Sequence, residues 1–390
     1  MSSGGSWGER VFRPLLLAVL LGLTACEGAP DASPPDVPVV QEKAKAALTV
    51  TPASGEGISP AGPFQVGVTG GKLTSVALTG ADDRVVKGEL TGDRWVATED
   101  LAYNKAYTWS GSAKGEDGAE VPVTGSFRTL KPSKLTSASA NVGDHQTYGV
   151  AMPIKITFSS PVQDKATVQK AMTVTTSVPT EGAWAWLSDR EAHWRPKEYY
   201  KPGTRVSVDV NVYGVPFGGG AYGAEDLHVQ FAIADRALVV KADTQSHRFV
   251  IYRDGVQLHD FPASYGLDTD PRRVTRSGTH VVMQKEAKRT MSSTVFDYKD
   301  VPVTWAVLLS NNGEFVHEYA NSMYAQGKQN VSHGCANLSP ADAKTFFDLT
   351  MIGDPVEVLN SSIKLGPADR DYYDWALDWE TWKSKSAVNG

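Results

Sequence analysis

Short stretches in which apolar and polar residues alternate recur along most of the chain, and they predict strands. Between residues 48 and 130 the clearest are Lys72–Leu78 and Tyr107–Gly111, and turns rich in Gly and Asp separate them. Successive side chains of a strand point to opposite faces, so a period of two indicates a sheet with one buried face. Regular short strands between such turns are typical of two packed sheets. We therefore predict a β-sandwich over residues 48–130.

The alternation continues in Pro153–Phe158 and Arg205–Val212, which predicts a second β module over residues 131–234. Within this module, the run Gly218–Gly220 is predicted to be a flexible loop. A glycine-rich phosphate loop opens a helix, and no helical pattern follows these glycines. We therefore assign no nucleotide to this module.

Residues 235–360 combine strand patterns with one helical pattern. Ala237–Ala242 and His247–Tyr252 predict strands, and Pro340–Asp348 predicts an amphipathic helix. The stretch Asp354–Leu359 is predicted to be the strand that closes the sheet. This mixture indicates a third module, which is mainly β with a short helix.

One predicted hairpin in the third module ends on a histidine. Trp305–Leu309 has the apolar composition of a buried strand, Ser310–Gly313 is a turn, and Phe315–His317 returns antiparallel to the first strand. His317 therefore lies at the end of a strand, where its side chain can face a pocket.

The last segment, residues 361–390, is rich in aromatic residues. Trp375, Trp379 and Trp382 recur at helical spacing, which predicts one apolar stripe on a helix. We expect this stripe to pack at a domain interface, and carbohydrate binding is the alternative.

The N-terminus has the pattern of an export signal. Arg10 and Arg13 precede the apolar run Pro14–Leu23, which is too short to span a bilayer stably. Small residues then precede Cys26, an arrangement that resembles a bacterial lipobox. The resemblance implies cleavage after residues 1–25 and lipidation of Cys26. An ordinary signal peptide or an uncleaved anchor is the alternative.

Residues 26–47 predict an extended linker, because repeated prolines remove backbone donors and fix φ. The whole chain has 38 basic and 44 acidic residues and no basic block. Binding to a nucleic acid backbone depends on clustered Lys and Arg, so the charge pattern gives no reason to expect a nucleic acid partner.

The chain has two cysteines, Cys26 and Cys335. If Cys26 carries lipid, Cys335 is the sole thiol of an exported protein and has no disulfide partner. A buried cysteine that acts as a small apolar residue is the alternative. The polar, Gly-containing turn Ser332–Asn337 around Cys335 disfavours this alternative, because it is not an apolar run.

Other reactive side chains lie near this thiol in the sequence. The segment Ser332–Asn337 reads Ser-His-Gly-Cys-Ala-Asn, and His317 lies upstream. A cysteine nucleophile needs a base or a positive charge that lowers its pKa, and His317 and His333 are the candidates. This pattern resembles the signature of the L,D-transpeptidases, which have a YkuD-type catalytic domain.

The resemblance implies a mainly β fold. It is to the actinobacterial lipoprotein members of the family. Two immunoglobulin-like β-sandwiches, at 48–130 and 131–234, would precede a YkuD-type β-sandwich catalytic domain at 235–360, with a Trp-rich segment at 361–390. The expected location is outside the cytoplasm, with the lipid on Cys26 holding the protein on the membrane face towards the cell wall.

The resemblance also implies a reaction. Cys335 would attack a peptidoglycan tetrapeptide stem, with His317 as the base, and release D-alanine. The acyl group would pass to the side-chain amine of a second stem and form a 3→3 cross-link. The N–H groups of Gly334 and Cys335 would hold the oxyanion, and His333 would assist there or tune the thiolate. No cofactor or metal is implied, and carbapenems are expected to inhibit covalently.

Substrate-binding residues follow from the same resemblance. A flap over the site would run from Val281 to Asp300, with Met291 and Tyr298 facing the substrate. Further contacts are expected from Asn312, Gly313, Ser332 and Asn337. Glu318 stands where many family members have a serine, so we expect its charge to affect the pKa of His317.

Three other functions are compatible with these residues. The same Cys and His could hydrolyse stems instead of joining them. His317, His333 and Cys335 could hold a catalytic zinc ion, which tolerates three protein ligands. The β modules could also form a wall-binding protein without activity.

Overall fold

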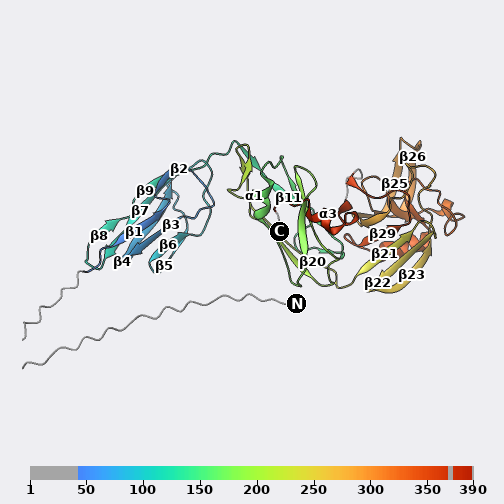
Figure 1. Cartoon of the computed structure of the whole chain (residues 1–390), viewed down its shortest axis with the longest axis horizontal. Helices are drawn as coiled ribbons and strands as arrows, with labels where there is room; N and C mark the ends of the chain where they lie inside the picture. Colours follow the sequence, from blue (N-terminus) through green and yellow to red (C-terminus); the bar gives the residue numbers. More distant parts are fainter. Residues whose placement is uncertain (1–42, 368–371, 389–390) are drawn as a thin grey trace, which may run out of the picture. The chain divides into compact units, whose positions relative to one another are not determined.

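The computed structural model describes residues 43–367 and 372–388 (Figure 1). The predicted signal peptide and Cys26 lie outside the described residues, as does most of the predicted linker. No helix in the described part of the chain is long and apolar enough to cross a membrane.

The first sandwich consists of two sheets with strand orders β1-β3-β6-β5 and β2-β9-β7-β4, and β8 pairs with β7. Alternate residues of these strands face a common core, in which Trp95 and Trp109 pack edge to face with ring centroids 5.5 Å apart. The strands are β1 (Ala47–Thr51), β2 (Ser54–Ile58), β3 (Gln65–Thr69), β4 (Gly71–Gly80), β5 (Gly88–Thr91), β6 (Arg94–Ala97), β7 (Ala106–Gly115), β8 (Glu120–Pro122) and β9 (Gly125–Thr129).

The second sandwich packs the sheets β11-β13-β16-β15 and β12-β20-β17-β14 around its own core, beside a small sheet β10-β19-β18. Its elements are β10 (Lys134–Thr136), β11 (Ala138–Ala140), β12 (Thr147–Tyr148), β13 (Ile154–Phe158), α1 (Lys165–Lys170), β14 (Met172–Thr176), β15 (Gly182–Trp186), β16 (Glu191–Pro196), β17 (Arg205–Val210), β18 (Pro216–Gly218), β19 (Ala221–Gly223) and β20 (Leu227–Ile233).

The prediction of a flexible loop at Gly218–Gly220 is wrong. Gly218 ends β18, Gly219 and Gly220 form the tight turn to the paired strand β19, and all three glycines have positive φ values. The Gly220 carbonyl accepts a hydrogen bond from the Ser133 N–H at 2.9 Å. Glycine is needed here for a tight turn and not for mobility.

The C-terminal module consists of a five-stranded sheet, β23-β22-β21-β29-β24, and a four-stranded sheet, β25-β26-β27-β28. Apolar side chains of both sheets and of helix α2 form one core. The elements are β21 (Leu238–Asp243), β22 (Arg248–Arg253), β23 (Val256–Pro262), β24 (Gly278–Val281), β25 (Gln284–Ser293), β26 (Tyr298–Leu308), β27 (Phe315–Glu318), η1 (Ala320–Ser322), β28 (Ala336–Leu338), α2 (Pro340–Leu349) and β29 (Pro355–Leu359).

The predicted strand at Asp354–Leu359 is confirmed as β29. It pairs in parallel with β21 and antiparallel with β24, so it is an interior strand. The predicted helix is confirmed as α2, and the Ser339 side chain caps it by accepting from the Asp342 N–H.

The C-terminal tail, residues 361–388 in the described ranges, contains the short helices η3 (Tyr373–Ala376) and α3 (Trp379–Lys383). The prediction of one helix carrying all three tryptophans is therefore wrong. Trp375, Trp379 and Trp382 nevertheless converge, because each ring lies within 5.2 Å of the guanidinium carbon of Arg195 on β16. The tail thus packs against the second sandwich through cation–π contacts.

We expect Trp382→Ala to lower the free energy of unfolding by about 3–5 kcal/mol, because it removes a fully buried ring. It also removes the hydrogen bond from Trp382 Nε1 to the Ala183 carbonyl, which is 2.9 Å long. Thermal and denaturant unfolding would measure the loss. Glu380→Ala on the exposed side of the same helix is the control and is expected to cost at most about 0.5 kcal/mol. Equal effects of the two substitutions would contradict this account of the tail.

Candidate active site

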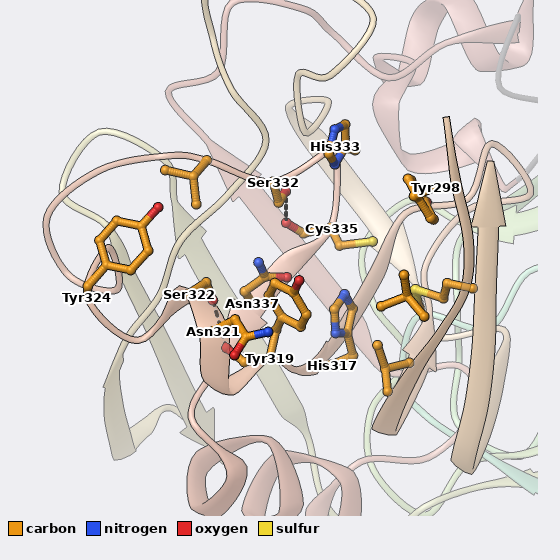
Figure 2. A pocket seen from close by; sticks show the side chains of 14 residues that line it. Tyr298, His317, Tyr319, Asn321, Ser322, Tyr324, Ser332, His333, Cys335 and Asn337 are labelled. Carbon is orange, nitrogen blue, oxygen red and sulfur yellow. Dashed lines mark hydrogen bonds between the residues drawn. The ribbon is translucent and has the colours of Figure 1, made fainter. Parts of the chain in front are cut away.

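Parallel pairing of two short strands brings the predicted nucleophile and base together. In the register of β27 with β28, His317 lies opposite Asn337. Paired residues of neighbouring strands project from the same face, and Cys335 precedes Asn337 by two residues. Figure 2 shows the His317 ring directed towards the Cys335 sulfur on the wall of one pocket.

This pocket is a cavity of about 350 Å³ in the C-terminal module. It contains most of the residues predicted from the sequence, and its lining combines hydroxyl, amide, imidazole and apolar groups. Cys335, His317, His333, Met291, Tyr298, Ser332 and Asn337 line it, together with Val301, Val303, Tyr319, Asn321, Ser322, Tyr324 and Val331. Asn312 and Gly313 are not among these lining residues.

His317 is buried and fixed in one tautomer. Its Nδ1 donates a hydrogen bond to the Glu318 carbonyl at 2.8 Å, so Nε2 of the neutral ring carries the free lone pair. Burial lowers the pKa of His317, and the opposing effects of the Glu318 carbonyl and carboxylate are smaller. The imidazole is therefore neutral near pH 7 and can accept a proton.

The Glu318 carboxylate is held away from the pocket. It accepts hydrogen bonds from the Thr304 hydroxyl and the Ala320 N–H, each 3.0 Å long. The backbone carbonyl of Glu318 orients the His317 ring, while the Glu318 carboxylate is hydrogen-bonded to Thr304 and Ala320. The expected influence of this residue on the pKa of His317 is present, but burial outweighs it.

Cys335 is a neutral thiol in this structure. Its sulfur packs beside an apolar cluster that includes Val303 and Phe315, and the thiol donates a long hydrogen bond to the Gly313 carbonyl at 3.6 Å. Burial raises the pKa of Cys335 to about 12, and the N–H of Phe315 offsets this only in part. The prediction that a neighbouring base depresses this pKa is wrong for the protein without substrate.

The turn around Cys335 is fixed by its own side chains. Ser332 Oγ donates to the Cys335 carbonyl at 2.6 Å and accepts from the Gly334 N–H at 3.1 Å. Thr275 Oγ1 donates to the Gly334 carbonyl at 2.8 Å. Gly334 has a φ of 123°, which only glycine adopts readily.

These contacts bear on two predicted roles. The Gly334 N–H donates to Ser332 Oγ in this conformation, so its role as an oxyanion donor stays a prediction that requires this bond to break. Ser332 lines the pocket, yet its hydroxyl bonds to the Cys335 carbonyl and the Gly334 N–H inside the turn. Gly334 and Ser332 therefore shape the nucleophile turn.

Asn337 lines the cavity, whereas Asn312 bonds to an arginine outside its lining. Asn337 is buried and exchanges backbone hydrogen bonds with Ser264, while its Oδ1 has no partner among the described residues. With its amide oxygen turned towards Arg276, Asn312 accepts from the guanidinium Nη2 at 2.8 Å.

His333 faces the flap. Its ring centroid lies 4.7 Å from that of Phe296 and 5.5 Å from that of Tyr298. Partial burial, and then the charge of Arg273, lower the pKa of His333. The predicted role at the oxyanion is not what this geometry shows, because the ring contacts the flap aromatics.

The flap is the hairpin of β25 and β26, which continues to Leu308 and is therefore longer than the predicted Val281–Asp300. Met291 and Tyr298 line the cavity as predicted. Phe296 was missed, although it lies next to the predicted flap residues. Its ring packs against His333 at an interplanar angle of 46°, and the ring centroid lies 5.7 Å from the guanidinium carbon of Arg272.

Several residues that support the site carried no recognisable sequence signal. Arg273 donates to the carbonyls of Val331 and Ser332, which fixes the start of the nucleophile turn. Glu314 is buried near that turn and bonds to Arg276. Their partners lie 38 to 59 residues away in the sequence, so no local pattern reveals them.

Within residues 43–367 and 372–388, no group of three or more His, Cys, Asp or Glu side chains is arranged to hold a metal ion. His317, His333 and Cys335 do not form such a group, because the His333 ring packs against the flap. The described residues thus give no support to the zinc alternative.

The chain matches two known families in succession. Residues 55–216 match the family described as bacterial Ig domain, and residues 237–358 match the L,D-transpeptidase catalytic domain, YkuD. Together with relatives that are similar over most of their length, these matches show that the chain belongs to the L,D-transpeptidase family.

Two of these relatives are proteins of Mycobacterium tuberculosis. L,D-transpeptidase 5 of strain ATCC 25618 / H37Rv is 48% identical over 87% of this chain and 77% of the relative. L,D-transpeptidase 2 of strain CDC 1551 / Oshkosh is 33% identical over 96% of this chain and 94% of the relative. A solved structure of LD transpeptidase LdtMt1 in complex with imipenem is 33% identical, with a TM-score of 0.49, and covers 58% of this chain and all of that one.

The lowered pKa of His317 predicts the acid limb of the pH profile. Because the base acts when it is deprotonated, we expect the rate of Cys335 acylation to fall only below pH 6.5. His317→Gln is expected to reduce this rate by about 10²–10⁴-fold and to abolish the limb. The measurement is the acylation rate against pH. His333→Gln is the matched control and should keep the limb at the wild-type pH; an acid limb above pH 7 in the wild type would contradict the assignment.

Proposed function

We propose that this L,D-transpeptidase forms 3→3 peptidoglycan cross-links through an acyl-enzyme on Cys335. The observation that carries the proposal is the Cys335 thiol beside a buried His317 whose Nε2 lone pair is free. A neutral thiol and a neutral imidazole form a proton donor and acceptor pair. The family membership supports the choice of reaction.

In the first half-reaction, the Cys335 sulfur attacks the carbonyl carbon between the third residue and the terminal D-alanine of a tetrapeptide stem. The thiol proton passes to His317 Nε2, the C–S bond forms, and the carbonyl becomes an oxyanion. The Cys335 N–H is a predicted donor to this oxyanion. When the oxyanion collapses, the C–N bond breaks and His317 gives its proton to the departing amine of D-alanine.

In the second half-reaction, the side-chain amine of a diamino acid in a neighbouring stem attacks the thioester. His317 accepts a proton from this amine, the new C–N bond forms, and the C–S bond breaks. The departing sulfur regains its proton, so the enzyme returns to its starting state. Water in place of the amine would give hydrolysis, which is the alternative function.

The cavity supports a peptide as the substrate. Its lining offers hydroxyl and amide groups from Tyr298, Tyr319 and Asn321. Such groups bind peptide N–H and C=O groups without a net charge. The exposed ring of Tyr324 at the cavity wall adds an apolar surface on which a second stem can pack.

We also propose that the protein works outside the cytoplasm, held on the outer face of the membrane by a lipid on Cys26. The support is the sequence of the signal and of the small residues before Cys26. A single thiol at Cys335 is consistent with this location, because a second free cysteine would risk a disulfide with the nucleophile.

Incubation with purified tetrapeptide muropeptides tests the reaction. We expect D-alanine and a 3→3 dimer in equal amounts, measured by liquid chromatography and tandem mass spectrometry. Cys335→Ala should yield neither product. Release of D-alanine with tripeptide and no dimer would instead favour the hydrolase.

A carbapenem tests the nucleophile independently of the stem substrate. Its strained ring amide offers an acyl carbon to the sulfur, so we expect one covalent adduct on the Cys335 peptide by mass spectrometry. Cys335→Ala should remain unmodified. An adduct at any other residue, or no adduct on a folded protein, would contradict the assigned nucleophile.

A further inference from the structure

A buried carboxylate lies directly beneath the nucleophile turn. Glu314 is 2% exposed, and it belongs to the turn between β26 and β27. A Cβ atom built on Gly334 would lie 3.6 Å from Glu314 Cγ, so the glutamate side chain passes under the residue before Cys335. The proposed chemistry does not use this carboxylate, and a buried charge is costly unless it is fixed by partners.

One arginine fixes this carboxylate. Glu314 Oε1 accepts from the backbone N–H of Arg276 at 3.0 Å and from its Nη1 at 3.2 Å. The same guanidinium donates to the Asn312 amide oxygen through Nη2 at 2.8 Å. Arg276 therefore clamps both ends of the segment Asn312–Glu314.

The clamped segment includes the residue that contacts the nucleophile. Between Asn312 and Glu314 lies Gly313, whose carbonyl accepts the Cys335 thiol hydrogen bond. The Gly313 N–H donates to the Ser310 carbonyl at 3.0 Å, which closes the turn. The position of the Gly313 carbonyl thus depends on a turn that the Glu314–Arg276 pair holds.

The other carboxylate oxygen faces a histidine. Glu314 Oε2 lies 4.0 Å from His280 Nδ1, and both atoms are buried and have no hydrogen-bond partner among the described residues. His280 Nε2 donates to the Arg276 carbonyl at 2.8 Å. Oε2 is therefore not neutralised by a direct hydrogen bond, and its charge acts on the surrounding buried groups.

We propose that Glu314 is a positioning residue for the nucleophile, which keeps Cys335 protonated and hydrogen-bonded to the Gly313 carbonyl until a substrate is bound. Its negative charge disfavours a second negative charge on the nearby sulfur, and its bond to Arg276 holds the accepting carbonyl in place. The inference rests on the proposed role of Cys335 as the nucleophile.

Other groups also act on the sulfur, and they come from each neighbouring strand. Arg289 on β25 favours the thiolate, Tyr298 on the flap is close enough to interact with the thiolate, and His317 on β27 is neutral. Burial is the largest contribution to the raised pKa of Cys335, followed by the Phe315 N–H, which opposes it, and the Glu314 charge. Removal of Glu314 should therefore lower the pKa without restoring the ordinary value of a free cysteine.

The test is the pH dependence of alkylation of Cys335 by iodoacetamide, measured on the Cys335 peptide of the full chain by mass spectrometry. Glu314→Gln keeps the acceptor for Arg276 but removes the charge. We expect the midpoint of its pH profile to fall relative to wild type, because the charge of Glu314 raises the pKa of Cys335. Arg276→Gln leaves the carboxylate without its cation, so its midpoint should move upward.

Asp354→Asn is the matched control, because Asp354 is a buried carboxylate bound by Arg236 on another part of the same module. Its midpoint should equal that of the wild type, whatever its effect on thermal unfolding. A wild-type midpoint in Glu314→Gln, or shifts of the same sign in the Glu314 and Arg276 variants, would overturn the proposal. If Glu314→Gln does not fold, Arg276→Gln alone decides, and a downward shift or no shift refutes the inference.

Alkylation requires no peptidoglycan, so this result is independent of the proposed reaction. Suppose that the muropeptide assay gives no products but the alkylation profiles shift as expected. This result would contradict the proposed substrate and would still support the role of Glu314. If the muropeptide assay instead gives the cross-linked dimer but the alkylation profiles do not shift, the proposed reaction would still be supported and only the role of Glu314 would be refuted.

Discussion

The parallel pairing of β27 with β28 is the constraint on which the site depends. Parallel neighbours need a long crossover, since a tight hairpin can join only antiparallel strands. Here the connection runs through residues 319–335, and it supplies much of the cavity wall, including Tyr319, Asn321 and Tyr324. The pairing therefore sets the distance between base and nucleophile, and the connection that it requires becomes the binding surface.

The second theme is the low polarity around the reacting atoms. His317 and Cys335 are both desolvated, and burial shifts each of them towards its uncharged form. An ion pair of thiolate and imidazolium is thus disfavoured in the free protein. In the proposed reaction, proton transfer to His317 would therefore accompany the attack of Cys335 on the carbonyl. A sulfur that remains protonated is also less readily oxidised than a thiolate.

Much of this arrangement could be predicted from the sequence, because alternation, turns and the Ser332–Asn337 motif are local signals. The alternation predicted the sandwiches, and the motif predicted which side chains meet in the pocket. The features that were not predicted depend on contacts between residues that are distant in the chain. The interior place of β29 follows from its pairing with β21, more than a hundred residues earlier. Glu314 carried no signal because its partner Arg276 lies 38 residues upstream.

The tail has a consequence for the order in which the chain can fold. The Lys385 carbonyl accepts a hydrogen bond from the Trp186 N–H on edge strand β15, and Ala387 packs against the core of the second sandwich. These residues are synthesised roughly two hundred positions after the strand that they cover. The second sandwich can therefore pair this edge only after the C-terminal module has been synthesised.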